Sequence, residues 1–358
     1  MPATETLSLD EVSVLLVWTA IAIYALAFIA YAIDLSRRSA VSIEQKDAAR
    51  ELVGAGYVSA AVAGRETIGQ VRAAEAAAQA RLEAAPAQRT RYLWARIATS
   101  LTVLAFLFHL AGDLTRGIAS GRVPWSNMYE FALTGTLLIV AVYLVTLFKY
   151  DLRFLGVLIT GLVVLLLGGT LVGGLYVEIV PLADPLKSVW LVIHVFVASL
   201  ATALFALAFG LSVLQLMQAR RERKVALAES TDAAAVEASV KPVKTGPGFL
   251  RTLPSADALE SLAYRFAIIG FIFWTFTLIA GSIWANDAWG RYWGFDTKEV
   301  WTFVIWVLYA GYIHARATRG WRGSRSAWLS IIGFTAVIFN FTIVNLFFKG
   351  LHVYSGLS

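Results

Sequence analysis

The stretch from Phe154 to Gly173 reads Phe-Leu-Gly-Val-Leu-Ile-Thr-Gly-Leu-Val-Val-Leu-Leu-Leu-Gly-Gly-Thr-Leu-Val-Gly and contains no charged side chain. About 20 mostly apolar residues cross a bilayer as one helix, because every backbone polar group must be satisfied within the segment. Seven further stretches of the chain qualify in the same way. The eight expected spans are residues 12–33, 93–114, 128–148, 154–173, 189–217, 263–283, 299–316 and 327–348. The sequence therefore predicts an all-α, polytopic membrane helix bundle.

The composition excludes several classes of protein. The chain has 358 residues, of which 58% are hydrophobic and only 15% are charged, far from the composition of a soluble domain. It contains no cysteine, so it forms no disulfide, binds no metal through thiolate and performs no thiol exchange. It also lacks a Walker-type Gly-Lys-Ser/Thr loop, so nothing indicates ATP hydrolysis.

The distribution of basic residues predicts the topology. Most of the 30 Lys and Arg residues fall in two linkers, 34–91 and 218–262, and in short connections on the same side. The positive-inside rule then places both termini outside and both linkers in the cytoplasm. The Ala-rich linker 34–91 is expected to be a solvated helical hairpin or a partly disordered connector. Residues 1–33 form the first retained span, because the acidic start has no signal-peptide character, and residues 92–358 form the main membrane domain.

An aromatic segment is expected as an outer loop over residues 284–299, which read Trp-Ala-Asn-Asp-Ala-Trp-Gly-Arg-Tyr-Trp-Gly-Phe-Asp-Thr-Lys-Glu. Tryptophan at a membrane rim is common, so an interfacial belt is one interpretation. Here, however, the rings alternate with glycines and with charges of both signs. Flat apolar surfaces, close backbone approach and paired charges favour a docking surface for a planar, partly anionic ligand.

Haem has this shape, and histidine is its usual axial ligand. Two of the four histidines lie on the expected outer side. His194 lies roughly 9 Å below the outer end of its span, at 1.5 Å per residue, and His352 follows the last span. Either histidine alone is more often structural. Together, on one side of the membrane beside one aromatic segment, they favour bis-imidazole ligation of an iron.

The other outer and intramembrane features leave alternatives open. His314 lies near the cytoplasmic end of its span and His109 in the outer part of another, so their depths argue against a shared iron. Each is either functional, since ionisable groups at such depths are costly, or a packing residue. The segment from Pro124 to Glu130 is either a turn with a capping Ser or Asn, or a wall of the same outer cavity.

Three motifs carry a family resemblance. The string Trp284-Ala-x-x-x-Trp-Gly-x-Tyr-Trp-x-Phe-Asp-x-Lys-Glu299 resembles the tryptophan-rich "WWD" signature of haem-handling proteins. Pro124-x-Ser-Asn-x-Tyr-Glu130 and the terminal Gly350-Leu-His are similar to the CcsA (ResC-type) subunit of the system II cytochrome c synthase. The resemblance covers spans two to eight. Phe295 stands where the family usually has Trp, and Thr297 where it often has Pro.

The resemblance implies that the chain carries haem b to the outer face of the cytoplasmic membrane. There the haem would be presented for thioether attachment to the Cys-x-x-Cys-His motif of apocytochrome c, the chain being a subunit of a holocytochrome c synthase. The implied partners are a CcsB (ResB-type) membrane subunit, the apocytochrome and a thioredoxin-like thiol reductant. No nucleic acid partner is expected.

The resemblance also implies roles for particular residues. His194 and His352 would be the external axial ligands, and His314 an intramembrane ligand whose partner comes from the CcsB-type subunit. The residues expected to contact the porphyrin and its carboxylates are Trp284, Trp289, Trp293, Phe295, Arg291, Asp296 and Lys298. No catalytic side chain is expected, because catalysis would consist mainly of positioning vinyl against thiol.

Two other functions remain open on the sequence. The first is a haem exporter or chaperone that passes haem to a separate ligase. The second is an ion-coupled transporter, which would pair ionisable residues at the bilayer midplane within interrupted spans. The clustering of unusual residues at the outer rim disfavours the second.

Overall fold

The computed structural model describes residues 7–61, 93–182, 184–234, 247–318, 320–348 and 350–351, and the regular structure in these ranges is entirely helical. The helices are α1 (Leu9–Ala61), α4 (Leu93–Ser120), α5 (Met128–Leu147), α6 (Gly156–Val172), α7 (Val189–Ala234), α8 (Ala256–Trp289), α9 (Thr297–Thr318), α10 (Ser324–Phe339) and α11 (Asn345–Phe347). A π-helical turn, Asn340–Val344, joins the last two. The all-α prediction is confirmed.

Each of the eight expected spans is helical, and seven helices in the described part of the chain are both long and apolar enough to cross a membrane. The helix α9 is not among the seven. Its 22 residues make it about 33 Å long at 1.5 Å per residue, enough for the hydrocarbon core, but its first turn carries Lys298 and Glu299. The protein is therefore a multi-pass membrane protein.

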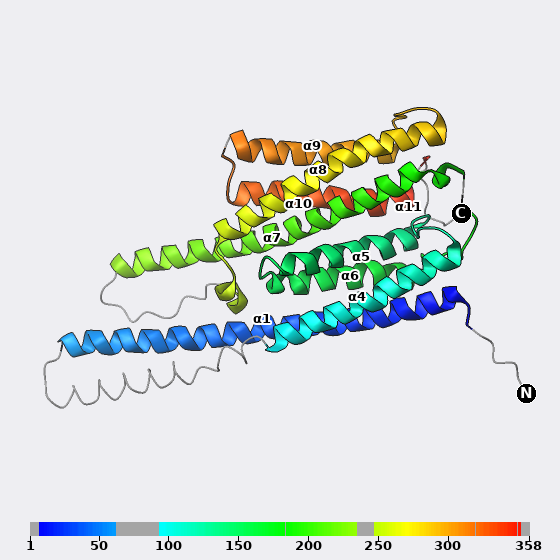
Figure 1. Ribbon diagram of the computed structural model, residues 1–358. Helices are drawn as coiled ribbons and strands as arrows, with labels where there is room; N and C mark the ends of the chain where they lie inside the picture. The colour runs from blue at the N-terminus through cyan, green and yellow to red at the C-terminus, as the bar shows by residue number, and fades with distance from the viewer. Residues whose placement is uncertain are drawn as a thin grey trace, which may run out of the picture.

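The helices lie side by side along one long direction (Figure 1). Among the described helices, α1 packs along α4, and α7 packs along α8. The connections 121–127, 173–188 and 290–296 lie at the same end of the bundle as Leu9 and Leu351. We call this the site end. The three connections at this end contain few Lys and Arg residues, so this is the end that the charge pattern places outside.

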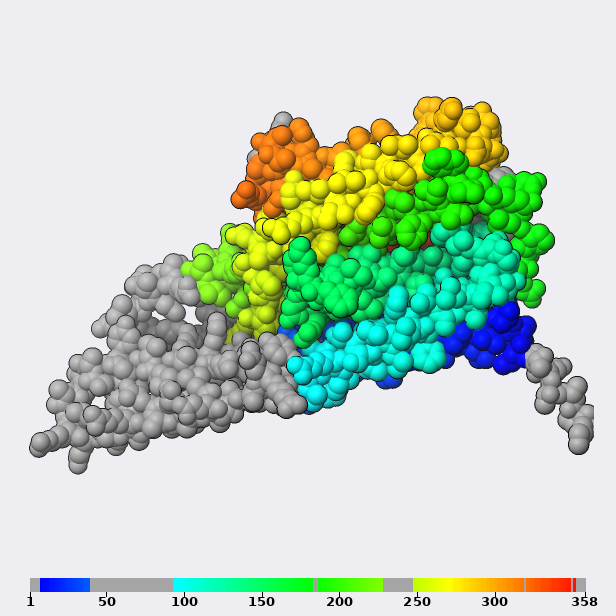
Figure 2. All heavy atoms as spheres, viewed as in Figure 1, coloured from blue at the N-terminus to red at the C-terminus, as the bar shows by residue number. Residues whose placement is uncertain are grey.

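The largest hydrophobic core lies among α5 and α7 to α10. The rings of Phe205 and Tyr309 stack with centroids 3.6 Å apart. Gly270 lets α8 approach α7, because a Cβ there would lie 2.8 Å from the Phe205 ring. In the space-filling view, the colours of α4, α7 and α8 follow one another across the visible face (Figure 2). The outer surface carries half-exposed side chains such as Leu107 and Ile272, as lipid contact requires.

The two expected linkers begin as helix. The helix α1 continues past Asp34 to Ala61, and α7 continues past Gln218 to Ala234. The remainder of the linker 34–91, from residue 62, and residues 235–246 lie outside the described residues. The boundaries proposed for the domains thus stay a prediction.

Candidate functional site

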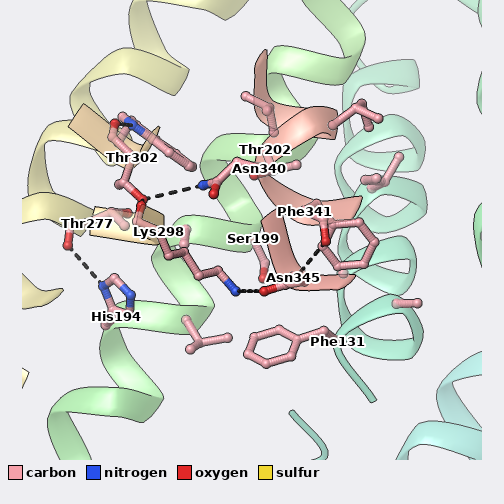
Figure 3. Close-up of a pocket in the computed structure, with 18 of the residues that line it drawn as sticks. Phe131, His194, Ser199, Thr202, Thr277, Lys298, Thr302, Asn340, Phe341 and Asn345 are labelled. Carbon is pink, nitrogen blue, oxygen red and sulfur yellow. Dashed lines mark hydrogen bonds between the residues drawn. The ribbon is translucent and has the colours of Figure 1, made fainter. Parts of the chain in front are cut away.

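His194 is held in a cradle on one face of α8. Its Nδ1 atom lies 3.0 Å from the carbonyl oxygen of Thr277, and its ring stacks on Trp284 at 5.9 Å and 16° between planes. Between these two positions is Gly281, where a Cβ would lie 2.7 Å from Cε1 of the imidazole. Positions 277, 281 and 284 share one helix face at i, i+4 and i+7. The backbone acceptor, the missing side chain and the indole together fix the imidazole plane, and Figure 3 shows the hydrogen bond between His194 and Thr277.

The partner of Nδ1 determines which nitrogen of His194 can bind a metal. A backbone carbonyl only accepts hydrogen bonds, so Nδ1 carries the proton and donates to Thr277. In a neutral imidazole the lone pair is then on Nε2, which is the arrangement found in metal-bound histidines oriented by a carbonyl. His194 is therefore oriented and in the tautomer that suits an axial ligand.

Two cavities meet at this histidine. The interior cavity, about 190 Å³, lies inside the bundle between α5, α7, α8, α9 and the π turn. The loop cavity, about 80 Å³, lies beneath residues 292 and 293. Side chains that line both cavities are His194, Thr277, Trp284, Lys298 and Thr302. The imidazole thus belongs to the wall between the bundle interior and the aromatic segment.

The interior cavity has one polar side. Lys298 points into it and donates from Nζ to Asn345 Oδ1 at 2.5 Å (Figure 3). Asn340, in the π turn, lies 3.5 Å from the Thr302 hydroxyl through Nδ2, while its Oδ1 is buried with no hydrogen-bond partner. π-helical turns often occur at functional sites because they re-aim side chains. Here the turn carries Asn340 and is followed directly by Asn345; both residues line the interior cavity, and Asn345 accepts from the ammonium group.

The aromatic segment differs from the loop expected over residues 284–299. Trp284 and Trp289 belong to α8, which ends where Gly290 adopts a left-handed conformation at φ 69°. Trp284 is only 1% exposed, so it lines the cavities from within instead of forming an open ledge. Trp293 and Phe295 lie in the true loop, and Phe295 is 81% exposed.

The loop is fastened to the C-terminal segment by Asp296. Its Oδ1 accepts from the backbone N–H of Leu351 at 3.0 Å, and its Oδ2 from that of Lys298 at 3.3 Å. Gly350 packs so closely on this carboxylate that a Cβ would clash with it. His352 itself lies outside the described residues, but the residue before it is bound to the aromatic loop.

The remaining loop residues have distinct placements. Glu299 Oε2 accepts from the backbone N–H groups of Gly294 and Asp296, which holds the loop in a tight turn. Arg291 is partly buried and lies against Gly294. Lys298, in contrast, extends inward. Arg291 and Lys298, both expected to contact the porphyrin carboxylates, thus differ in placement: Arg291 lies against the loop and Lys298 lines the interior cavity.

The other two histidines have opposite surroundings. His109 is fully buried, with Nε2 2.9 Å from the Leu133 carbonyl and Nδ1 3.4 Å from the Tyr24 hydroxyl. Both ring nitrogens are engaged by protein groups, so His109 is a packing residue between α1, α4 and α5. His314 is exposed on α9, close to the end of the helix opposite the site end. The structure does not bring it near His194.

The segment from Pro124 to Glu130 serves the first of the two roles considered for it, a turn with a capping residue, and none of its residues lines the interior or the loop cavity. Asn127 caps α5 by accepting from the Glu130 N–H at 2.9 Å. Trp125 packs in the same apolar cluster as Trp284, whereas Phe131, just after the segment, lines the interior cavity. The Glu130 carboxylate points away from the cavity, into a separate ionic network.

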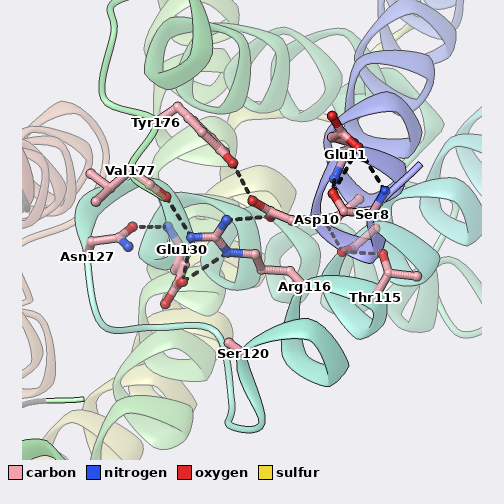
Figure 4. A network of polar contacts seen from close by, with 12 residues as sticks. Ser8, Asp10, Glu11, Thr115, Arg116, Ser120, Asn127, Glu130, Tyr176 and Val177 are labelled. Atoms are coloured by element: carbon pink, nitrogen blue, oxygen red, sulfur yellow. Dashed lines mark hydrogen bonds and ion pairs between the residues drawn. The ribbon is translucent and has the colours of Figure 1, made fainter. Parts of the chain in front are cut away.

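That network joins four elements at the site end (Figure 4). Arg116 on α4 is fully buried; it binds Asp10 at 2.6 Å, Glu130 at 3.0 Å and the Val177 carbonyl at 2.7 Å. Arg122 adds a second ion pair to Glu130 at 2.6 Å. Tyr176 donates to Asp10, and burial, reinforced by that hydrogen bond, raises the pKa of Tyr176. No local pattern in the sequence indicates this network.

A bundle of membrane-spanning helices with an oriented imidazole between two aromatic-walled cavities defines a polytopic membrane protein with a candidate binding site near one end. Residues 125–352 match the family model described as cytochrome C assembly protein. The chain belongs to this family, and its role is in cytochrome c biogenesis.

Curated relatives agree with this assignment. The chain is 34% identical over 248 residues to a cytochrome c biogenesis protein CcsA from Guillardia theta, covering 68% of this chain and 80% of the relative. A CcsA protein from Microcystis aeruginosa is 33% identical over 273 residues, covering 67% and 81%. One from Prochlorococcus marinus is 32% identical over 245 residues, covering 67% and 78%. The resemblance to CcsA proteins is thereby confirmed.

Proposed function

We propose that this protein carries haem b to the outer face of the cytoplasmic membrane and presents it there to apocytochrome c. The observation that carries the proposal is the His194 cradle, in which Thr277 fixes the Nδ1–H tautomer while the ring lines both cavities. An imidazole arranged in this way is prepared for an axial position on iron. Haem is the cargo in this proposal, not a resident cofactor.

The second axial ligand is proposed to be His352. The hydrogen bond from the Leu351 N–H to Asp296 supports this proposal, because it attaches the adjoining residue to the aromatic loop. Asp296 would therefore position the C-terminal ligand against the loop. Trp284, Trp289, Trp293 and Phe295 would supply the aromatic walls, and Arg291 and Lys298 the positive charge for the two propionates.

The chemical role proposed for the chain is positioning. The cargo supplies the vinyl groups, and each cysteine S–H of the client adds across one C=C bond so that a C–S and a C–H bond form. The imidazoles and the aromatic walls would hold the reacting carbon still and would exclude competing orientations. Since the chain has no cysteine, a thioredoxin-like reductant must keep the client thiols reduced.

The route from the cytoplasmic side is proposed to begin at His314. This side chain is exposed on α9 instead of packing inside the bundle. An exposed ionisable group within a membrane helix needs a partner from outside the chain. A CcsB (ResB-type) subunit would supply that partner, and the two chains together would form the holocytochrome c synthase.

The visible spectrum of the purified protein tests the proposal. The protein is co-expressed with its companion subunit, and a low-spin, bis-histidine haem spectrum is expected for the wild type. His194→Ala and His352→Ala should each abolish that spectrum, whereas His109→Ala should keep it. A wild-type protein without such a spectrum would contradict the proposal.

A second experiment separates synthesis from haem delivery alone. The reconstituted pair is incubated with a Cys-x-x-Cys-His peptide and a thiol reductant, and thioether product is measured by mass spectrometry. Product supports the synthase. Bound haem without product would instead favour an exporter that serves a separate ligase.

A further inference from the structure

The interior cavity has an unusual charge balance. Its wall is mainly apolar, with Phe131, Leu191 and Trp274 among the lining residues. The one cation on that wall is Lys298, and among the described residues that line this cavity there is no carboxylate. The side-chain partner of Lys298 is the neutral amide of Asn345. A positive charge beside an apolar cavity is stabilised when an anion joins it there.

Two acidic side chains flank Lys298 in the sequence, and both accept from backbone N–H groups; Glu299 does so within the loop and lines only the loop cavity. Asp296 uses its two carboxylate oxygens to accept from the N–H groups of Lys298 and Leu351, and it lines neither the interior nor the loop cavity. On the opposite side of the ammonium group, Asn340 has a buried Oδ1 without a partner. In the described part of the chain Lys298 forms no ion pair with a carboxylate, and Asp296 acts on it only through its field.

The size of the cavity limits what it can admit. Pockets for drug-sized ligands usually have about 300–1,000 Å³, whereas this one has about 190 Å³. A whole porphyrin does not fit, but one edge of it does. The edge that carries carboxylates matches the ammonium group of Lys298, while the edge that carries vinyl groups offers that group nothing to bind.

We infer that the interior cavity is a carboxylate subsite, which admits one propionate-bearing edge of the haem with Lys298 as its counter-ion. A carboxylate oxygen replaces Asn345 Oδ1 as the acceptor at the ammonium group of Lys298. Because the propionate edge points into the bundle, the vinyl side faces away from the interior, where a client thiol can reach it. This inference rests on the proposed function and adds to it the orientation of the cargo.

The test compares haem with its dimethyl ester, in which both carboxylates are blocked while the iron and the vinyl groups are unchanged. The purified full-length protein is titrated with each, and dissociation constants are obtained from the Soret band. A charge-assisted hydrogen bond is worth about 1.5–3 kcal/mol, so the wild type should prefer haem by about tenfold or more.

Two variants and one control make the test specific. Lys298→Met removes the charge, and Asn345→Asp keeps the shape of the cavity but neutralises Lys298 internally. Both should lose most of the preference for haem over the ester, and Arg291 accounts for what is left. Lys187→Met, which removes an exposed lysine paired with Asp184, should keep the wild-type preference.

The possible results are distinguishable. Equal affinity of the wild type for the two porphyrins overturns the carboxylate subsite but leaves haem binding intact. Full preference retained in Asn345→Asp also overturns it, and this variant decides the question if Lys298→Met fails to fold. A wild type that binds neither porphyrin contradicts the proposed function itself.

Discussion

Arg116 and Lys298 are two cations at the same end of one helix bundle, yet their surroundings are opposite. Arg116 contacts two carboxylates and a backbone carbonyl, and it is fully buried. Lys298 faces a cavity and donates to a neutral amide. A charge whose partners all come from the chain stabilises the fold. One whose partners are incomplete within the chain leaves part of its interaction energy for a ligand.

The histidines repeat this contrast. Protein groups engage both ring nitrogens of His109, whereas His194 donates from Nδ1 to the Thr277 carbonyl and lines two cavities. The structural examples join α1, α4 and α5, and the functional examples lie where α7, α8, α9 and the π turn meet. One half of the site end therefore holds the helices together, and the other half contains the cavities in which we propose that the cargo binds.

The largest effect is expected for Glu130→Gln. This substitution leaves the fully buried Arg116 without its full countercharge and also weakens the hold on Arg122. Breaking one partner of a buried pair typically costs about 3–5 kcal/mol. Thermal unfolding in detergent should show a large decrease in the melting temperature.

Asp10→Asn is the matched control for that experiment. The Asp10 side chain is 22% exposed, so solvent screens its interaction with Arg116. Its effect should be clearly smaller than that of Glu130→Gln. If the two variants lower the melting temperature equally, the buried ion pair between Arg116 and Glu130 does not stabilise the fold more than the partly exposed pair with Asp10.

The next effect concerns the structural histidine. His109→Ala removes two buried hydrogen bonds and opens a cavity between α4 and α5, for an expected loss of about 2–4 kcal/mol in stability. The haem spectrum of the folded fraction should not change, because the ring lines neither cavity. Loss of the low-spin spectrum at unchanged stability would mean that His109 is a ligand.

Gly281→Ala should separate site geometry from stability. The new Cβ would overlap the His194 ring at 2.7 Å, and such overpacking costs roughly 1–3 kcal/mol unless the imidazole moves. Since the ring borders two cavities, we expect it to move. Haem affinity should then decrease by about tenfold, measured by titration, while the melting temperature changes little.

Gly311→Ala on α9 provides the comparison, since a Cβ at that position meets no atom within 4 Å. It should leave both haem affinity and stability near those of the wild type. If Gly281→Ala and Gly311→Ala lower the haem affinity equally, the loss in Gly281→Ala does not come from contact between the new Cβ and His194.

The sequence predicted the spans and many of the site residues, but it did not predict how they meet. Hydrophobic length alone located all eight helices, and the aromatic motif identified Trp284 and Lys298. It did not identify Thr277 or Gly281, because their importance depends on the register of α8 against α7. The available signal was the helical spacing of Thr277, Gly281 and Trp284, which places the three residues on one face of α8.

Other features had no local signal at all. The pairing of Asp10 with Arg116 joins residues from different helices, more than 100 positions apart. The π turn at Asn340 lies inside an apolar run that reads as ordinary helix. The expected loop over 284–299 was too long, since only Gly290 and its left-handed backbone show where α8 ends.

The smallest effect is expected for Asp296→Ala, which cuts the connection between the two halves of the proposed ligand set. The substitution removes the acceptor for the Leu351 N–H, a bond worth about 1–2 kcal/mol. Amide hydrogen exchange at Leu351 should accelerate by about tenfold, with global stability nearly unchanged. Asp296→Asn retains one acceptor oxygen and should give an intermediate rate. If exchange at Leu351 is already fast in the wild type, Asp296 does not hold the C-terminal segment, and the loop and His352 would have to be brought together by the cargo itself.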